Sequence, residues 1–452
     1  MKILPSISIS LILWVPTVLA QIELNLNSMS SINDSLSLIA AGLMDYYNGD
    51  TYGGTPGMMV APYYWWEAGA AWNSILDYWY YTGDTQYNDI LKTALLFQTG
   101  PDNNYMPPNQ STTEGNDDQG FWGITVMAAA ERNFSNPTDN EPGWLYLAQA
   151  VFNTMAWRWD TANCGGGLRW QIYTWNSGYD YKNSVANGCL FQLGARLARY
   201  TGNTSYVEWA EKVWDWMESV GFMTNASNIY DGATINSAGE CTNPSMNEWT
   251  YNYGLYTAGC AYLYNFTNDT TWLTRTENLL SSGSSLFFDN GVMYEQACQP
   301  KNTCDTDQRC FKAIYSRFLG LTALMAPTLS SQIMTLLASS ATAAAGTCNG
   351  GSDGHTCGLN WLQTGWDDVW GLGEQMSALE VIQANLVNTK PAPLTNSTGG
   401  TSKGSGDAGS NSASTNLLTN TLTVTTKDKA GAGIVTVLCV ALMVGTGYWM
   451  FR

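Results

Sequence analysis

Two neighbouring aspartates, Asp117 and Asp118, lie in the stretch EGNDDQGFWG, which begins at Glu114. Only 12% of the residues are charged, so an adjacent acidic pair is unusual for this chain. Glycoside hydrolysis uses two carboxyl groups, which stand about 5–5.5 Å apart when the anomeric configuration is retained. Neighbouring side chains on one helical turn, about 100° apart in direction, can approach that closely. The pair therefore predicts a retaining carbohydrate-cleaving site.

A helix start at this point would give the two aspartates different roles. Asn116 is a favourable N-cap residue, which would place Asp117 and Asp118 in the first turn. The helix dipole favours one ionised carboxylate, as a nucleophile needs, and mutual repulsion raises the proton affinity of the other, as an acid needs. Aspartates in a first turn also serve as simple helix caps, so spacing alone leaves both interpretations open.

A second acidic pair, Asp367 and Asp368, lies beside Trp366 in the stretch GWDDVW. It also precedes a helix-like run, so it is either a cap pair or an alternative catalytic dyad. A third interpretation is a clamp for sugar hydroxyls, because the flat indole of Trp366 offers a stacking surface for a sugar.

Other catalytic chemistries have few residues to use. The one histidine, His355, lies between Cys348 and Cys357, our best candidates for a local disulfide. A Ser-His-Asp triad or a histidine-based zinc site would depend on this residue, which we interpret as a surface residue of the loop. No glycine-rich phosphate loop follows a strand, and a net charge of −18 disfavours nucleic acid. We expect neither a metal nor another cofactor.

Aromatic residues are abundant and cluster near polar side chains. The chain has 20 tryptophans and 25 tyrosines, with clusters at YYWWE (63–67), GGLRW (166–170) and EWTYNYG (248–254). Packing between helices accounts for many of these rings. Amphipathic rings beside Asn, Glu and Asp nevertheless predict a groove for a neutral polyol, with stacking surfaces and hydrogen-bond partners.

Helical hairpins are the elements expected to position these residues. Similar polar turns recur at Asp84, Asp139, Asn203 and Asp269, roughly 60 residues apart, between segments of helical period. This period favours an all-α (α/α)6 toroid of about twelve helices in six hairpins, although an open solenoid has a similar signature. The expected helices span 34–47, 65–81, 85–98, 119–132, 143–157, 183–200, 205–220, 248–264, 270–287, 311–325, 329–343 and 366–386.

Both ends of the chain carry targeting patterns. Residues 1–20 have the apolar stretch and small-residue end of a cleaved secretory signal. Residues 434–452 are almost wholly apolar and follow a Ser/Thr/Gly-rich stretch over 389–433, which favours a GPI-anchor signal over a membrane-spanning helix. The globular domain is expected over 21–388, followed by a linker and a removed tail. Candidate attachment residues are Gly409, Ser410, Asn411 and Asn420.

Sequons and cysteines fit the secretory pathway. Ten cysteines suit an oxidising compartment, and because only Cys439 lies in the tail, an odd number remains for the globular part. At least one of these is therefore unpaired. Glycosylation sequons occur at Asn33, Asn109, Asn133, Asn203, Asn225, Asn265, Asn268 and Asn396.

Five ordered motifs carry a family resemblance. They are WWE-x-G (65–69), NDDQGFW (116–122), GGL-x-W (166–170), YKNSVAN (181–187) and TYNYG (250–254), and they span nearly all of the globular part. On these motifs the chain resembles glycoside hydrolase family 76, and within it the fungal GPI-anchored endo-1,6-α-mannosidase-like proteins of cell-wall biogenesis.

The resemblance implies an (α/α)6 fold and a retaining mechanism on α-1,6-mannosidic bonds. It makes Asp117 the nucleophile and Asp118 the general acid/base. Tyr253 stands where bacterial members have glutamine, which affects the expected sugar preference. The implied groove residues are Trp65, Trp66, Asn116, Trp122, Lys182, Asn183, Asn187, Tyr251, Asn252, Trp366, Asp367 and Asp368.

The resemblance implies two functions, and a third stays open beside them. The first is cleavage of α-1,6-linked mannose glycans, either mannan or the mannose core of GPI glycans, by a monomeric protein at the outer face of the plasma membrane and in the cell wall. The second is transfer of GPI-anchored proteins from that core to a β-glucan acceptor. The third, of another class, is a non-catalytic mannan-binding scaffold of the wall. Membrane contact is expected only through the GPI lipid.

Overall fold

The computed structural model describes residues 22–409, together with residues 429, 433, 435–437, 439, 440 and 443. The chain divides into two compact units, Met1–Ser412 and Ala413–Arg452, and the described residues of the second unit are helical. Several expectations lie outside the described residues: the signal over 1–20, most of the tail over 434–452, and the attachment candidates Ser410, Asn411 and Asn420.

The search for membrane-spanning helices covered the described residues only. Among them, no single helix has the length and apolar composition needed to cross a membrane. One bent pair, Thr306–Met325 with Pro327–Thr347, passes by length and composition alone.

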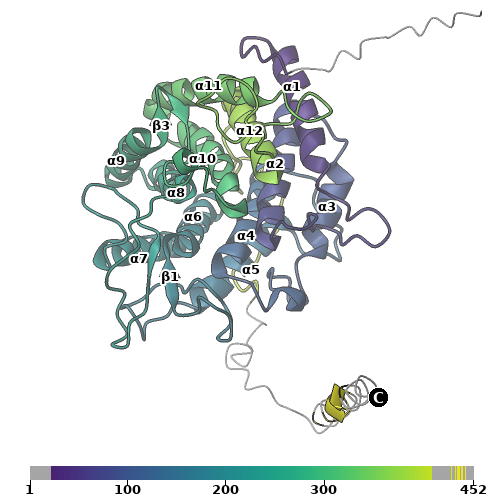
Figure 1. Ribbon diagram of the computed structural model, residues 1–452. Helices are drawn as coiled ribbons and strands as arrows, with labels where there is room; N and C mark the ends of the chain where they lie inside the picture. The colour runs from purple at the N-terminus through teal and green to yellow at the C-terminus, as the bar shows by residue number, and fades with distance from the viewer. Residues whose placement is uncertain are drawn as a thin grey trace, which may run out of the picture. The chain divides into compact units, whose positions relative to one another are not determined.

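Twelve α-helices within residues 22–409 form an inner and an outer ring (Figure 1). Each inner helix packs on the next, and the last contacts the first, so the inner ring is closed. This closure confirms the predicted (α/α)6 toroid and excludes the open solenoid. The inner helices are α2 (Trp65–Thr82), α4 (Asn116–Glu131), α6 (Ser184–Thr201), α8 (Thr250–Thr267), α10 (Thr306–Met325) and α12 (Leu372–Gln383).

The outer helices cover the inner ring and differ from it in residue pattern. The inner helix α4 buries every residue except Asp118, as expected for a helix surrounded by others. The outer helix α7 buries only one face, which includes Tyr206, Ala210 and Val213. The outer helices are α1 (Met29–Met44), α3 (Asn88–Phe97), α5 (Trp144–Trp157), α7 (Ser205–Ser219), α9 (Thr270–Phe287) and α11 (Ser330–Thr347).

The repeated turn motif ends three of the inner helices. Gly83, Gly202 and Asn268 follow α2, α6 and α8 in the left-handed conformation, with φ of 81°, 75° and 58°. Glycine and asparagine adopt this conformation at low cost, and it ends a helix by bonding its last carbonyls. The predicted hairpin turns are thus helix C-caps that lead to the outer ring.

Two short antiparallel ribbons join the helices. β1 (Tyr181–Asn183) pairs with β2 (Gly232–Thr234), with Lys182 opposite Ala233, and β3 (Phe288–Asp289) pairs with β4 (Val292–Met293). Disulfides link Cys164 to Cys241, Cys298 to Cys304 and, as predicted, Cys348 to Cys357. Cys189, Cys260 and Cys310 are free and buried, in line with the odd count.

Residues 391–409, which we call the C-terminal strap, pack on the barrel, although they lie in the stretch predicted as a linker. The amide of Leu394 donates to the carbonyl of Glu131 (2.8 Å), and that of Asn396 donates to the carbonyl of Tyr200 (3.0 Å). Gly404 has no room for a side chain, since a Cβ there would meet Leu145 at 2.6 Å. The small residues that resemble a flexible linker therefore allow close packing on the barrel.

The sequon asparagines differ in accessibility. Asn133 is half-buried, and its side chain donates to Gly399 (2.8 Å) and accepts from the amide of Thr401 (2.9 Å) in the strap. Asn33 is also half-buried. The exposed ones are Asn109, Asn203, Asn225, Asn265, Asn268 and Asn396.

Candidate active site

The amino-terminal ends of five inner helices surround a cavity of about 730 Å³. Its walls include Trp65 of α2, Asp117 of α4, Asn183 immediately before α6, Tyr251 of α8 and Asp307 of α10. Helix amino termini carry partial positive charge, which stabilises negative groups nearby. A ring of parallel helices thus favours carboxylates at this end of the barrel.

Asp117 is held on the cavity wall by two hydrogen bonds. Asn183 Nδ2 donates to Oδ2 (3.3 Å), and the amide of Asp118 donates to Oδ1 (3.2 Å). Burial raises the pKa of Asp117 to about 7, although both hydrogen bonds favour the ionised form. Asp117 can therefore exchange its proton near neutral pH.

Asp118 also lines the cavity and is the one α4 residue that is half-buried, where all the others are fully buried. Its Oδ2 accepts a hydrogen bond from the amide of Gly115 (2.6 Å). Burial, followed by the like charge of Asp117, raises the pKa of Asp118 well above its usual value. Neither aspartate forms an ion pair with another described residue, so the two carboxyls are free to act on a ligand.

The N-cap lies one residue before the predicted N-cap, and α4 begins three residues before the expected segment 119–132. Gly115 is the N-cap, and Asn116 is the first helical residue. Asn116 Nδ2 donates to the carbonyl of Arg169 (2.9 Å), and Oδ1 accepts from Nε of Arg158 (2.8 Å). Asn116 does not line the cavity, so it positions the first turn of α4 from behind.

Five aromatic rings that contact one another line the cavity. The ring of Trp66 lies 4.9 Å from that of Phe121, and the ring of Phe311 lies 3.8 Å from Tyr251 and 5.6 Å from Trp249. All five residues line the cavity. Such a surface can stack sugar rings and can also attract a cation.

The cavity wall is acidic. Carboxyls at Asp231 and Asp307 accept hydrogen bonds from the indoles of Trp249 (3.1 Å) and Trp66 (2.7 Å), respectively. Burial raises the pKa of both, that of Asp307 to about 6. Among the described residues, the cavity lining has no lysine, arginine or histidine. It has six acidic residues, namely Glu114, Asp117, Asp118, Asp231, Asp305 and Asp307.

Four of the predicted groove residues line the cavity, namely Trp65, Trp66, Asn183 and Tyr251. Three others are buried elsewhere. Trp122 stacks behind Trp65 at 5.2 Å, and Asn187 bonds the backbone amide of Leu168 (2.8 Å). Asn252 is buried within α8. The structure therefore corrects the predicted sugar contact of these three residues, because they are buried and none lines the cavity.

The second acidic pair also lies outside the cavity lining. The carboxyl of Asp367 accepts from the amides of Leu359 (3.2 Å) and Asn360 (2.9 Å), so it holds a loop together. Asp368 is exposed, and Trp366 packs closely on Gly350. The structure thus gives this pair a role in loop architecture.

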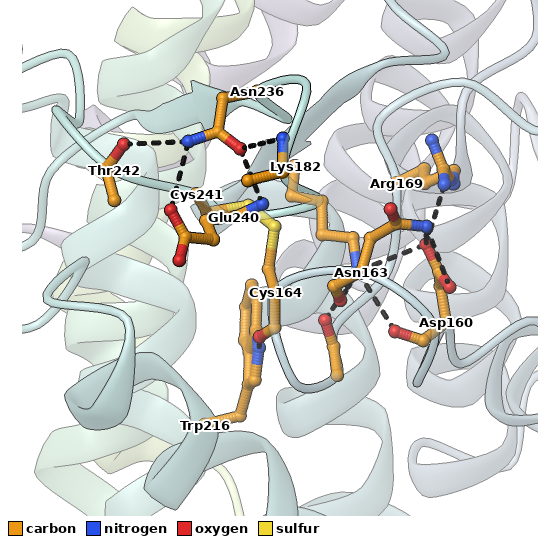
Figure 2. The surroundings of a disulfide bond; sticks show 12 residues. Asp160, Asn163, Cys164, Arg169, Lys182, Trp216, Asn236, Glu240, Cys241 and Thr242 are labelled. Atoms are coloured by element: carbon orange, nitrogen blue, oxygen red, sulfur yellow. Dashed lines mark hydrogen bonds and ion pairs between the residues drawn. A yellow bond between two sulfur atoms is a disulfide. The ribbon is translucent and has the colours of Figure 1, made fainter.

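Lys182 points away from the cavity although its neighbours face it. Successive residues of a strand point to opposite sides, and Tyr181 and Asn183 take the cavity side of β1. The side chain of Lys182 is buried, and its ammonium group reaches Asp160 and Asn163 beside the Cys164–Cys241 disulfide (Figure 2). The predicted contact of Lys182 with sugar is therefore corrected.

Sequence reasoning missed several cavity residues. Tyr181 and Trp249 lie within or beside quoted motifs, so their positions offered a signal. Asp305 and Asp307 carry the same pattern as the 117–118 pair, acids at the start of a helix, and were not singled out. Asp231 and Phe311 offered none, because only the fold brings them to the cavity.

A closed ring of paired helices with two adjacent carboxyls on an aromatic cavity defines a glycoside hydrolase of the (α/α)6 type. The family model for glycosyl hydrolase family 76 matches residues 31–397. The chain belongs to this family.

Fungal relatives cover almost the whole chain. "Mannan endo-1,6-alpha-mannosidase DCW1" of Saccharomyces cerevisiae is 56% identical, over 95% of this chain and 95% of its own length. "Mannan endo-1,6-alpha-mannosidase DFG5" of the same yeast is 53% identical, over 95% and 94%.

Solved structures agree on the fold. Dfg5 from Chaetomium thermophilum, in complex with glucosamine, is 40% identical with a TM-score of 0.82, over 85% of this chain and 97% of that one. The α-1,6-mannanase GH76A of Salegentibacter sp. HEL1_6, an inactive variant in complex with α-1,6-mannotetrose, has a TM-score of 0.62 at 18% identity. The match covers 78% of this chain and 98% of the mannanase chain. At this identity, the similarity supports the fold and nothing further.

Proposed function

We propose that this protein is a retaining endo-acting enzyme that cleaves α-1,6-mannosidic bonds in cell-wall mannan or in GPI-core glycans. The observation that carries the proposal is that Asp117 and Asp118 open side by side onto one aromatic cavity, and neither is consumed by an ion pair among the described residues. The names of the fungal relatives support the α-1,6-mannoside as substrate.

In the proposed mechanism the two aspartates divide one displacement. The ionised Asp117 attacks the anomeric carbon, while Asp118 donates its proton to the leaving glycosidic oxygen. A mannosyl-enzyme ester forms at Asp117. Asp118, now ionised, removes a proton from the acceptor hydroxyl, which attacks the anomeric carbon and releases Asp117. Water as acceptor gives hydrolysis, and a sugar hydroxyl gives transfer.

The acidic wall favours a GPI-core glycan over plain mannan. Asp231 and Asp307 bond the indoles of Trp249 and Trp66, and both indoles lie near the ring of Phe311. This combination of acids and rings suits a protonated amine better than a neutral hydroxyl. A GPI core carries an amino sugar, whereas mannan does not. The glucosamine bound to the fungal relative supports this choice.

A transferase that uses a wall β-glucan as acceptor is the second candidate. It is favoured by the same acidic wall, because a GPI-core donor would bring an anchored protein to the site. We also propose that the protein is monomeric, passes through the secretory pathway and is glycosylated. A GPI lipid attached at one of the candidates Gly409, Ser410, Asn411 and Asn420 would hold it at the plasma membrane. The scaffold function remains as an outcome of the test.

Incubation with α-1,6-mannotetraose, and separately with a GPI-core glycan plus a β-glucan oligomer, tests these proposals. Mass spectrometry should show cleavage by the natural protein and none above background by Asp117→Asn. The matched control is Asp368→Asn, which changes an exposed acid of the other pair. A glycan joined to glucan indicates the transferase. Equal cleavage by the natural protein and Asp117→Asn would refute Asp117 as the nucleophile, and no cleavage by the natural protein would refute the enzyme and leave the scaffold.

A further inference from the structure

Lys182 is fully buried yet carries a charge, so its surroundings must compensate for the lost water. Its Nζ donates to the carbonyls of Asp160 (3.0 Å), Asn163 (2.7 Å) and Gly166 (2.6 Å), which we call the carbonyl cage (Figure 2). An ammonium group has three N–H donors, and the cage uses all of them. The carboxylate of Asp160 adds an ion pair at 3.3 Å.

The glycine-rich motif explains why the loop can form this cage. Cys164, Gly165, Gly166 and Gly167 all have positive φ, at 53°, 65°, 147° and 89°. Left-handed backbone is easily adopted by glycine and turns the loop back on itself, so that its carbonyls converge. A disulfide joins Cys164 of this loop to Cys241 (Figure 2).

The residues of β1 on either side of Lys182 are hydrogen-bonded to the first turn of α4, which carries Asp117. Asn183, the next residue after Lys182, donates to Oδ2 of Asp117 (3.3 Å). The carbonyl of Tyr181, the residue before, accepts from the amide of Trp170 (2.7 Å), whose own carbonyl accepts from the amide of Asn116 (2.7 Å). Both neighbours of Lys182 are thus linked to the first turn of α4.

We propose that Lys182 is a positioning residue, which locks β1 onto the carbonyl cage and thereby holds the Asn183 amide against the Asp117 carboxyl. This inference rests on the proposed function, in which Asp117 is the nucleophile. Lys182 touches no substrate. Its role is to fix the position of β1, whose opposite side forms part of the cavity wall. Neither methionine nor arginine can donate three converging hydrogen bonds from the position of the Lys182 ammonium group.

The role gives a readout that simple destabilisation would not. The Asn183 bond favours ionised Asp117, so its loss raises the Asp117 pKa and moves the acidic limb of kcat/KM to higher pH. The other titratable groups that interact electrostatically with Asp117 are Asp118, Asp307, Cys189 and Tyr251. Those that bear on Lys182 are Asp160 and Arg169.

The test compares Lys182→Met and Gly165→Ala in the full chain, with α-1,6-mannotetraose as substrate. Gly165 has open space around its Cβ position, so alanine there strains the backbone of the loop without a clash. Gly202→Ala is the matched control, with φ of 75° and equally open space at the far end of α6. Gly165→Ala also keeps the test valid if Lys182→Met fails to fold.

We expect Lys182→Met to lower kcat/KM about tenfold or more and to raise its acidic limb by roughly half a pH unit. Gly165→Ala should shift the limb in the same direction, and Gly202→Ala should not. In an Asn183→Ala background, Lys182→Met should add less than about twofold, because both changes break one linkage. The inference is overturned if the acidic limb of kcat/KM does not shift in Lys182→Met and Gly165→Ala. It is also overturned if Lys182→Met causes its full loss of kcat/KM again in the Asn183→Ala background. An active Asp117→Asn variant would instead overturn the proposed function.

Discussion

The C-terminal strap should stabilise the barrel although its sequence resembles a linker. It completes the start of α5, whose N-cap residue Gly143 has no side chain to bond the first amides. Ser402 Oγ accepts from the amide of Leu145 (2.9 Å), and the carbonyl of Lys403 accepts from the amide of Tyr146 (3.2 Å). A distant segment thus provides the helix cap.

The expected loss can be worked out from these contacts. Removing one N-cap partner costs about 1 kcal/mol, so Ser402→Ala should cost about that much. At about 2.1 cal/mol/K per residue, a domain of this length has an unfolding entropy of roughly 0.8 kcal/mol/K. Ser402→Ala should then lower Tm by about 1 °C. A chain that ends at Lys390 also loses the bonds to Glu131 and Tyr200, and several such bonds at about 1 kcal/mol each lower Tm by roughly 4 °C or more.

Calorimetry and amide hydrogen exchange measure the two effects separately. Exchange at Leu145 and Tyr146 should accelerate in Ser402→Ala and further in the shortened chain, while α7 stays unchanged. Lys403→Ala is the control, because it removes an exposed side chain and keeps the carbonyl. A shortened chain that melts within a degree of the full chain, with unchanged exchange in α5, would refute the capping role.

Four further predictions concern charged groups of the cavity and the core. Because catalysis needs ionised Asp117 and protonated Asp118, kcat/KM should rise as pH approaches about 7 and fall at higher pH, which a pH–rate profile checks. Folding raises the pKa of Asp117 from its unfolded value near 4 to about 7, so its contribution to stability is fully present below about pH 4 and is lost as the pH rises through 7. Asp117→Asn should therefore reduce the fall in Tm between about pH 5 and pH 8. An unchanged fall contradicts this. Asp307→Asn should weaken binding of glucosamine more than of mannose in calorimetric titrations, and equal losses would speak against an amine site. Arg196→Met leaves the buried Glu131 without its ion pair and should cost about 3–5 kcal/mol in chemical denaturation, whereas a loss under about 1 kcal/mol would show that Glu131 finds another partner.

The sequence alone determined the helices, their pairing in hairpins and the acidic turn. Helical period and turn residues such as Gly83 and Gly202 are local signals, because a helix and its cap depend on residues a few positions apart. Asp117 and Asp118 were found for the same reason, since both lie in one turn. The local disulfide between Cys348 and Cys357 was also readable from short spacing.

Only the tertiary structure decided what each side chain faces. Lys182 and Asn183 are neighbours in one motif, yet the strand turns one into the carbonyl cage and the other onto the cavity. Asp307 reaches the cavity because the ring closes, and the strap is ordered because the barrel offers it Leu145 and Tyr146. These outcomes depend on contacts between residues far apart in the chain, whose energy no local pattern records.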